Sequence, residues 1–329
     1  MRAAVVVELG SPPRVDERPE PARDPGRALV RVAAASLNPI EIRVASGRFA
    51  REAKPPYVPG LEGTGLVVEA DGFEQGVRVR FEAAALPGFG EDGVLAELAC
   101  VPEDALIELP DQVDDAPAAA MGTVGITALA ALERAGLANG ERVLVLGATG
   151  AVGQMAVQLA KLMGAERVVA AGRDPGRLER SRELGADEIV ALSEDADLQT
   201  AFSDAAGGPL DVVIDPLWGP PAMAALAVLA TDGRMVNVGE SAGTDVSLPL
   251  AQIRNKQGAI LTLSSGWMAL ESKQEVYRRV LEHAVAQRIE VDHEVVPLAE
   301  VGEAWERQGA SPGRKLVIRT TEDAVEAGP

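Results

Sequence analysis

Hydrophobic residues follow two different patterns along this chain. Up to about residue 118, short apolar runs alternate with turns rich in Pro and Gly, which is typical of a β-sandwich or a partly open barrel. These runs are residues 3–7, 28–33, 66–69, 77–81 and 94–101. A short helix is predicted over residues 39–46, because Asn38 is a favourable N-cap and Pro39 suits the first helical position.

From residue 116 onward, apolar runs of strand length alternate with segments of helical spacing. An Ala-rich helix is predicted over residues 116–133, before Gly136. Strands are predicted at 143–146, 168–171, 188–191, 211–215, 234–238 and 259–263, with helices at 175–184, 196–206 and 221–230 among those between them. This alternation predicts a doubly wound parallel sheet.

The last part of the chain returns to short strands. A long amphipathic helix is predicted over residues 271–287, followed by strands at 294–296 and 315–319 with a short helix at 301–307 between them. The chain is therefore predicted to be an α/β protein with three segments. A doubly wound domain, residues 120–266, is inserted between the two parts of a β-rich domain, residues 1–119 and 267–329.

The stretch from residue 141 to residue 174 contains a candidate binding motif. The apolar run 143–146 is followed at once by a glycine turn of sequence GATGAVG, residues 147–153, and then by a helical pattern and a second apolar run. In this context Gly150 would let the backbone approach a pyrophosphate, Gly153 would let the helix pack on the strand, and free N–H groups would face the anion. The match is imperfect, because the first glycine position holds Ala148, with Gly147 one place earlier. The alternative is a tight turn that binds nothing.

Composition narrows the range of partners. The formal net charge is −19, which makes nucleic acid and anionic membrane surfaces poor partners. A single cysteine, Cys100, cannot form an internal disulfide, and no apolar run has the length of a spanning helix. With 47% hydrophobic residues, the chain can bury a substantial core. A soluble, cytoplasmic protein that binds a small molecule is expected.

Several motifs occur in an order that resembles a known family over nearly the whole chain. They are Asn38-Pro39 with Gly47, and the runs 59–65, 76–79, 147–153, 211–215 and 313–317. Together they resemble the medium-chain dehydrogenase/reductase superfamily, in its zinc-free quinone oxidoreductase branch. The resemblance implies a GroES-like catalytic domain wrapped around a Rossmann domain, with the active site in the cleft between them. It also implies a homodimer whose Rossmann sheets join edge to edge.

Zinc binding is not predicted. Zinc requires thiolate, imidazole or carboxylate ligands, and Leu61 stands where the resemblance places a histidine ligand. Cys100 alone cannot form a structural site of four cysteines. The two histidines, His283 and His293, lie late in the chain.

The end of the second strand of the motif bears on the choice of nicotinamide cofactor. The residue about 20 positions after the glycine turn contacts the adenosine ribose in dinucleotide-binding folds. Counting from Gly153 gives Arg173, whose guanidinium suits a 2′-phosphate, with Arg177 as a second cation. NADP(H) is therefore predicted. A shift of one residue would instead place Asp174 at the ribose and favour NAD.

Without a metal, a substrate must already be able to accept hydride. Quinones and alkenes conjugated to a carbonyl fit this requirement, if the protein orients the nicotinamide and donates a hydrogen bond to the developing enolate. The sequence therefore predicts an NADPH-dependent, zinc-independent reductase of such substrates. Two alternatives are a metal-free carbonyl or alcohol oxidoreductase and a nucleotide-binding protein with little turnover.

The resemblance also implies which residues form the site. Those expected around the nicotinamide are Asn38, Thr127, Val238, Gly239, Ser264 and Ser265. The other residues predicted to bind the cofactor are Ala148, Thr149, Gly150, Ala151, Val152, Gly153, Gly172, Arg173, Arg177 and Lys315. The catalytic candidates are Asn38, Glu41, Arg43, Tyr57 and Trp267, the last because it follows Ser264-Ser265-Gly266 directly.

Overall fold

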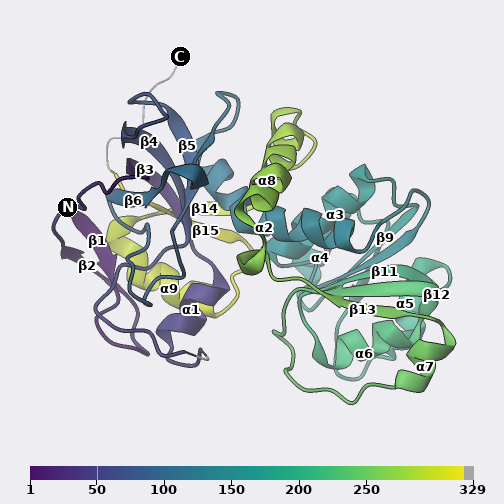
Figure 1. The fold of residues 1–329 in the computed structure, drawn as a ribbon. Coiled ribbons are helices and arrows are strands. Elements are labelled where there is room, and N and C mark those ends of the chain that lie inside the picture. The colour runs from purple at the N-terminus through teal and green to yellow at the C-terminus, as the bar shows by residue number, and fades with distance from the viewer. Residues whose placement is uncertain (50, 322–329) are drawn as a thin grey trace. The chain divides into compact units, whose positions relative to one another are not determined.

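A computed structural model describes residues 1–49 and 51–321 of the chain (Figure 1). The chain forms two compact units. Unit 1 consists of Met1–Gly122 and of the chain from Val291 onward, and unit 2 is Thr123–Glu290. The last residues of the predicted third segment, 322–329, lie outside the described residues.

Unit 1 is built on strands that pair antiparallel, apart from β14 (His293–Pro297) and β15 (Lys315–Arg319), which are parallel. Its main sheet has the order β14, β15, β3 (Arg27–Ser36), β4 (Glu62–Glu69), β5 (Arg78–Glu82) and β7 (Ile107–Glu108), and β6 (Leu98–Pro102) also pairs with β3. A second sheet pairs β1 (Arg2–Val5) with β2 (Arg14–Glu17). Strand β3 is thus bonded to β4, β6 and β15, so residues from both ends of the chain share one sheet.

Two helices complete the part of unit 1 that carries candidate residues. Helix α1 (Pro39–Ala45) begins after Asn38, as its Pro at the first position predicts, and α9 (Val301–Gly309) lies against it. The core beneath them combines apolar side chains of the strands and of both helices, among them Val30, Leu37, Val44, Trp305 and Leu316.

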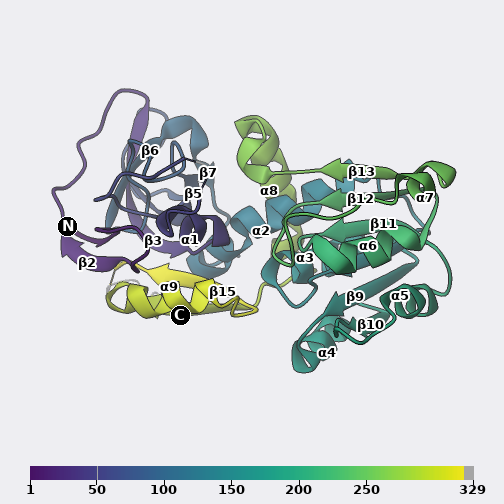
Figure 2. The ribbon, with the colours of Figure 1, turned by 90° about the horizontal axis from the view of Figure 1, so that it is seen from below.

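Unit 2 contains the predicted doubly wound sheet, and its strands are all parallel. Their order is β10 (Glu188–Ala191), β9 (Arg167–Gly172), β8 (Arg142–Leu146), β11 (Leu210–Asp215), β12 (Leu229–Asn237) and β13 (Ala259–Thr262) (Figure 2). The order reverses direction between β8 and β11. In open α/β sheets ligands bind at such a switch point, beyond the carboxyl ends of the strands.

Helices cover both faces of this sheet. Helix α3 (Ala151–Leu162) lies on one face, and α5 (Leu198–Ala206) and α6 (Gly219–Ala227) lie on the other, where Phe202 and Leu226 pack against Leu144 and Val213 (Figure 1). The remaining helices of this unit are α4 (Pro175–Glu183), α7 (Leu250–Asn255) and α8 (Leu270–Val285).

The boundary between the second and third segments differs from the prediction. Residues 267–290, which were expected to return to the β-rich domain, belong to unit 2. Helix α8 packs on α2 (Asp115–Arg134): a Cβ at Gly125 would lie 2.9 Å from Val280, and Arg279 Nη2 donates to Glu133 Oε2 at 3.0 Å. The amphipathic pattern predicted the helix correctly but could not tell which core its apolar face covers.

Helix α6 also differs from the prediction. It ends at Ala227 instead of residue 230, because Leu229 already pairs with Leu210 of β11. Helix α2 alone among the described helices has the length and apolarity of a membrane span, and 78% of its most apolar window is buried in the protein. This burial is what the core helix of a globular fold shows.

Candidate active site

The glycine turn after β8 has the geometry of an anion-binding turn. Gly147 adopts a φ of +61°, and Gly150 is the N-cap of α3. A Cβ at Gly153 would lie 2.4 Å from the carbonyl oxygen of Gly147, so only glycine lets the helix approach the strand this closely. The amides of Ala151, Val152 and Gly153 lie in the first turn of α3, where no carbonyl within the helix can accept from them. They are available to an anion.

The turn is held against the end of the neighbouring strand, β9. Ala148 N donates to Ala171 O at 2.9 Å. A Cβ at Gly172 would lie 2.6 Å from Thr149 Cγ2, so the turn packs directly on the backbone of this glycine. The predicted residues Ala148, Thr149 and Gly172 are therefore brought together at one sheet edge.

The segment after β9 contains Arg173 and Asp174, the two residues considered for contact with the adenosine ribose. Asp174 is the N-cap of α4, and its Oδ1 accepts from Arg177 N at 2.9 Å. Arg173 and Arg177 are exposed, and neither forms an ion pair with another described residue. By contrast, Arg182 pairs with Glu179 of the same helix and with Glu188 of β10. Within the described part of unit 2, Arg173 and Arg177 thus remain open to a ligand.

The other predicted cofactor residues of unit 2 lie at the same edge of the sheet. Val238 and Gly239 follow β12, and a Cβ at Gly239 would lie 2.7 Å from the carbonyl oxygen of Pro216. Thr127 of α2 donates from Oγ1 to Ser265 Oγ at 2.9 Å, which joins residues far apart in the sequence. Ser264 and Ser265 follow β13 at a short 3₁₀ turn, Ser265–Trp267.

A buried carboxylate at this edge was not predicted. Asp215, at the end of β11, accepts from the backbone N–H groups of Leu217 at 2.9 Å and Trp218 at 2.8 Å. Asn237 Nδ2 donates to Asp215 Oδ2 at 2.7 Å and to Gly239 O at 2.7 Å, so it ties β11 to β12. Burial raises the pKa of Asp215 in spite of these donors. An acidic residue that ends a buried apolar strand was the sequence signal for this clamp.

In unit 1, the candidate residues centre on Asn38, which is 2% exposed. Its Nδ2 lies 3.3 Å from Glu41 Oε1, 3.2 Å from Glu62 Oε1 and 3.3 Å from Ser36 O. Lys315 Nζ donates to its Oδ1. Both ends of the amide are therefore engaged within unit 1, and the amide cannot rotate without losing these contacts.

Behind Asn38 lies a buried charged cluster, which we call the Asn38 cluster: Asn38, Glu41, Glu62, Arg80 and Lys315, all at most 3% exposed. Arg80 Nη2 donates to Glu62 Oε2 at 3.0 Å, and Lys315 Nζ lies 3.7 Å from Glu62 Oε1. Burial alone would raise the pKa of Glu62, but Lys315 and Arg80 hold it below its usual range. Glu62 and Arg80 were not predicted as site residues.

Glu41 is the member of the cluster whose charge changes near neutral pH. It accepts from Leu61 N at 2.9 Å and from Asn38 N at 3.3 Å. Burial raises its pKa to about 7, against the opposing effects of Lys315 and of these donors. Burial likewise lowers the pKa of Lys315, although Glu62 and Glu41 oppose this shift. Lys315, predicted to contact the cofactor, is buried here and holds Asn38.

The remaining catalytic candidates, Tyr57, Arg43 and Trp267, lie outside the Asn38 cluster. Tyr57 is 4% exposed, its hydroxyl has no hydrogen-bond partner among the described residues, and burial raises its pKa to about 12, with the charge of Glu41 adding to the shift. Arg43 lies on the exposed side of α1, away from Glu41 two residues before it. Trp267 of unit 2 is 92% exposed, so its own unit supplies no wall around it.

Comparisons with known proteins agree with this architecture. The alcohol dehydrogenase GroES-like domain model matches residues 24–111, and the zinc-binding dehydrogenase model matches residues 151–285. A quinone oxidoreductase from Thermus thermophilus, also solved in complex with NADPH, is 30% identical with a TM-score of 0.79, covering 97% of this chain and 100% of that chain. An NAD-dependent alcohol dehydrogenase is 26% identical with a TM-score of 0.88, covering 98% and 100%.

A much longer relative belongs to the phenolphthiocerol/phthiocerol polyketide synthase of Mycobacterium tuberculosis. It is 32% identical over 323 residues, which cover 90% of this chain but only 14% of that synthase polypeptide. The chain belongs to the medium-chain dehydrogenase/reductase superfamily, as its motifs predicted, with a GroES-like and a Rossmann domain.

One of the matching family models is that of a zinc-binding dehydrogenase, but the side chains around Asn38 do not suit this metal. Zinc is held by thiolate, imidazole and carboxylate groups. The carboxylates of the Asn38 cluster are opposed by the cations of Arg80 and Lys315, and Leu61 contributes only a backbone N–H. Among residues 1–49 and 51–321, no group of three or more His, Cys, Asp or Glu side chains is placed to hold a metal ion.

Proposed function

We propose that the protein is an NADPH-dependent, zinc-independent reductase of quinones or of alkenes conjugated to a carbonyl. The observation that carries this proposal is the Asn38 cluster, in which Arg80 and Lys315 balance the buried carboxylates. Such a cluster offers no Lewis acid to polarise a simple carbonyl. Quinones and enones do not need one, because their incoming charge is delocalised onto oxygen.

The preference for NADPH is supported by the turn at the end of β9. Asp174 is engaged as the N-cap of α4, whereas Arg173 and Arg177 have no ion pair in the described part of the chain. Two open guanidinium groups suit a 2′-phosphate, and a capping carboxylate is less free to accept from a 2′-hydroxyl. The similarity to the Thermus thermophilus enzyme solved with NADPH points in the same direction.

The reaction assigns a distinct task to each group of residues. When bound, the reduced nicotinamide supplies the hydride. The amides of Ala151, Val152 and Gly153 would hold the pyrophosphate, and the Thr127–Ser265 pair would position the nicotinamide end. The hydroxyl of Tyr57 has no partner among the described residues and stays protonated at neutral pH, so it is suited to donate to the enolate oxygen.

A substrate panel tests the proposal. NADPH oxidation is measured with 1,4-benzoquinone, 2-cyclohexenone and cyclohexanone, each repeated with NADH. We expect turnover with the quinone or the enone, little with the ketone, and a preference for NADPH. Turnover of the ketone alone would instead support the second candidate, a metal-free carbonyl or alcohol oxidoreductase, which the similarity to an NAD-dependent alcohol dehydrogenase favours. No turnover together with tight NADPH binding would indicate a nucleotide-binding protein.

We also propose that the protein is a homodimer joined through β13. This strand lies at the edge of the sheet of unit 2, bonded to β12 alone among the described strands, and Ala259 and Thr262 on it are exposed. An uncovered edge strand presents unpaired backbone groups to a second strand. Leu263 N donates to Asn237 O of β12, so the N–H of Thr262, one position earlier, faces the open edge. Sedimentation equilibrium of the wild type and of Thr262→Pro, which removes this outward backbone donor from β13, distinguishes a dimer from a monomer.

A further inference from the structure

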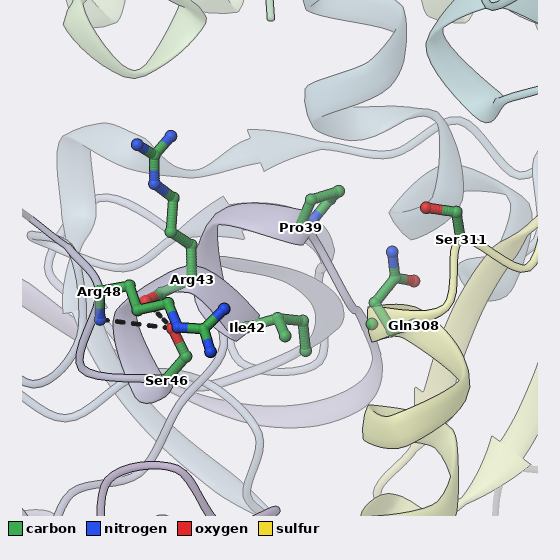
Figure 3. Close-up of a pocket in the computed structure, with 8 residues that line it drawn as sticks. Pro39, Ile42, Arg43, Ser46, Arg48, Gln308 and Ser311 are labelled. Atoms are coloured by element: carbon green, nitrogen blue, oxygen red, sulfur yellow. Dashed lines mark hydrogen bonds between the residues drawn. The ribbon is translucent and has the colours of Figure 1, made fainter. Parts of the chain in front are cut away.

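Unit 1 contains a hollow outside the Asn38 cluster, between α1 and the end of α9. Its volume is about 440 Å³. Figure 3 shows Arg43 and Arg48 on the side of α1 and the turn after it, and Gln308 and Ser311 on the side of α9. Ile42 lies between the two sides, so the hollow has an apolar floor with polar groups at its margin.

The charge of this margin is unusual for the chain. The protein carries a formal net charge of −19, yet none of the described residues that line the hollow is acidic, and two of them are arginines. Arg48 forms no ion pair with another described residue, whereas Arg307 on α9 pairs with Glu294 and Arg27 pairs with Glu91. An uncompensated guanidinium beside a hollow favours an anion that can accept a forked pair of hydrogen bonds.

Gln308 independently indicates that the ligand must also carry a hydrogen-bond donor. Its side chain is 8% exposed, and its Oε1 is buried without a hydrogen-bond partner in the described structure. A buried amide oxygen without a donor is unfavourable unless a ligand supplies one. The ligand that fits is therefore an anion with a hydroxyl or amide N–H close by.

We propose that this hollow binds the phosphate group of an organic phosphate. Arg48, whose guanidinium lies beside Ile42, contacts the phosphate, Ser46 and Ser311 lie at its margin, and Gln308 accepts from a hydroxyl or N–H next to the phosphate. The phosphate can belong to the dinucleotide cofactor or to a phosphorylated substrate. The site does not depend on the reductase proposal, because it is defined by unit 1 alone.

Binding of ribose 5-phosphate tests the site, because this probe carries a phosphate beside hydroxyl groups. Calorimetric titrations at constant ionic strength compare the wild type with Arg48→Ala and with Arg31→Ala. Arg31 is exposed on β3, outside the hollow, so its loss removes the same charge from unit 1. We expect Arg48→Ala to weaken binding about tenfold, as for a charged hydrogen bond, and Arg31→Ala to leave it within about twofold. Equal affinities of the two variants would overturn the proposal.

Three further measurements separate the remaining possibilities. Gln308→Leu should weaken ribose 5-phosphate more than inorganic phosphate, and its melting temperature reports whether it folds. If Arg173→Ala alone abolishes binding, the phosphate is bound only in unit 2, and the hollow is not a site. If saturating NADPH removes the Arg48-dependent binding, the hollow holds a phosphate of the cofactor, and if that binding persists, it holds a phosphate of the substrate.

Discussion

The glycine turn presents backbone groups, whereas the Asn38 cluster is made of side chains. The turn after β8 offers backbone amides, and its geometry depends on the absence of a side chain at Gly153. The Asn38 cluster consists of side chains that are at most 3% exposed and that contact one another. The first region is therefore sensitive to added volume, and the second is sensitive to the loss of a charge.

The largest effect is expected when the charge balance of the cluster is broken. Glu62→Gln removes the carboxylate that Arg80 and Lys315 share, while Arg80 keeps its contact with Glu82 Oε1 at 2.6 Å. The free energy of unfolding should fall by about 3–5 kcal/mol, measured by urea unfolding. Glu294→Gln, which removes the partner of Arg307 at the surface, is the control and should cost less than about 1 kcal/mol. A similar small loss for Glu62→Gln would mean that water reaches the cluster.

Titration of Glu41 gives the next largest effect. Its pKa is about 7 in the folded protein, against an ordinary value of 4.5, so the folded state binds the proton more tightly than the unfolded chain. The stabilisation that this provides is complete below pH 4.5 and is lost as the pH rises to about 7. Relative to Glu41→Gln, the wild type should lose up to about 3 kcal/mol across this range. Parallel pH profiles of the two proteins would contradict the assignment.

Added volume in the turn should act through the backbone. In Gly153→Ala the new Cβ would lie 2.4 Å from Gly147 O, whereas in Gly150→Ala its nearest neighbour would be that same oxygen at 3.4 Å. We expect the first change to lower the free energy of unfolding by about 1–3 kcal/mol and the second to have a smaller effect. Thermal and urea unfolding of the pair measures this difference. If both cost the same, the close approach at Gly153 is not what the fold requires.

Removal of a surface cation should affect only one cofactor. Arg173→Ala is expected to weaken NADPH binding at least tenfold, about the size of a charged hydrogen bond, and NADH binding by less than about twofold. Arg182→Ala, whose guanidinium pairs with Glu179 and Glu188, should change neither affinity. Fluorescence titration of both cofactors provides the comparison. Equal losses for NADPH and NADH would remove Arg173 from the phosphate site.

The two regions also differ in how far the sequence predicts them. The turn was predictable because strand, glycines and helix are contiguous, and each has a local physical requirement. The Asn38 cluster was predicted only in part, since Lys315 is 277 positions from Asn38 and Arg80 lies in β5, where charged and apolar residues alternate. Pairing of β3 with both β4 and β15 brings these residues together, and this long-range register is not encoded locally.

We propose that hydride transfer by this protein needs no zinc, and removal of bound metal tests this proposal. The protein is dialysed against EDTA, its zinc content is measured, and NADPH oxidation with the quinone or enone that it turns over is compared before dialysis, after dialysis and after zinc is added back. We predict the same kcat and KM in all three states, with negligible bound zinc. Loss of activity on dialysis that zinc restores would contradict this claim.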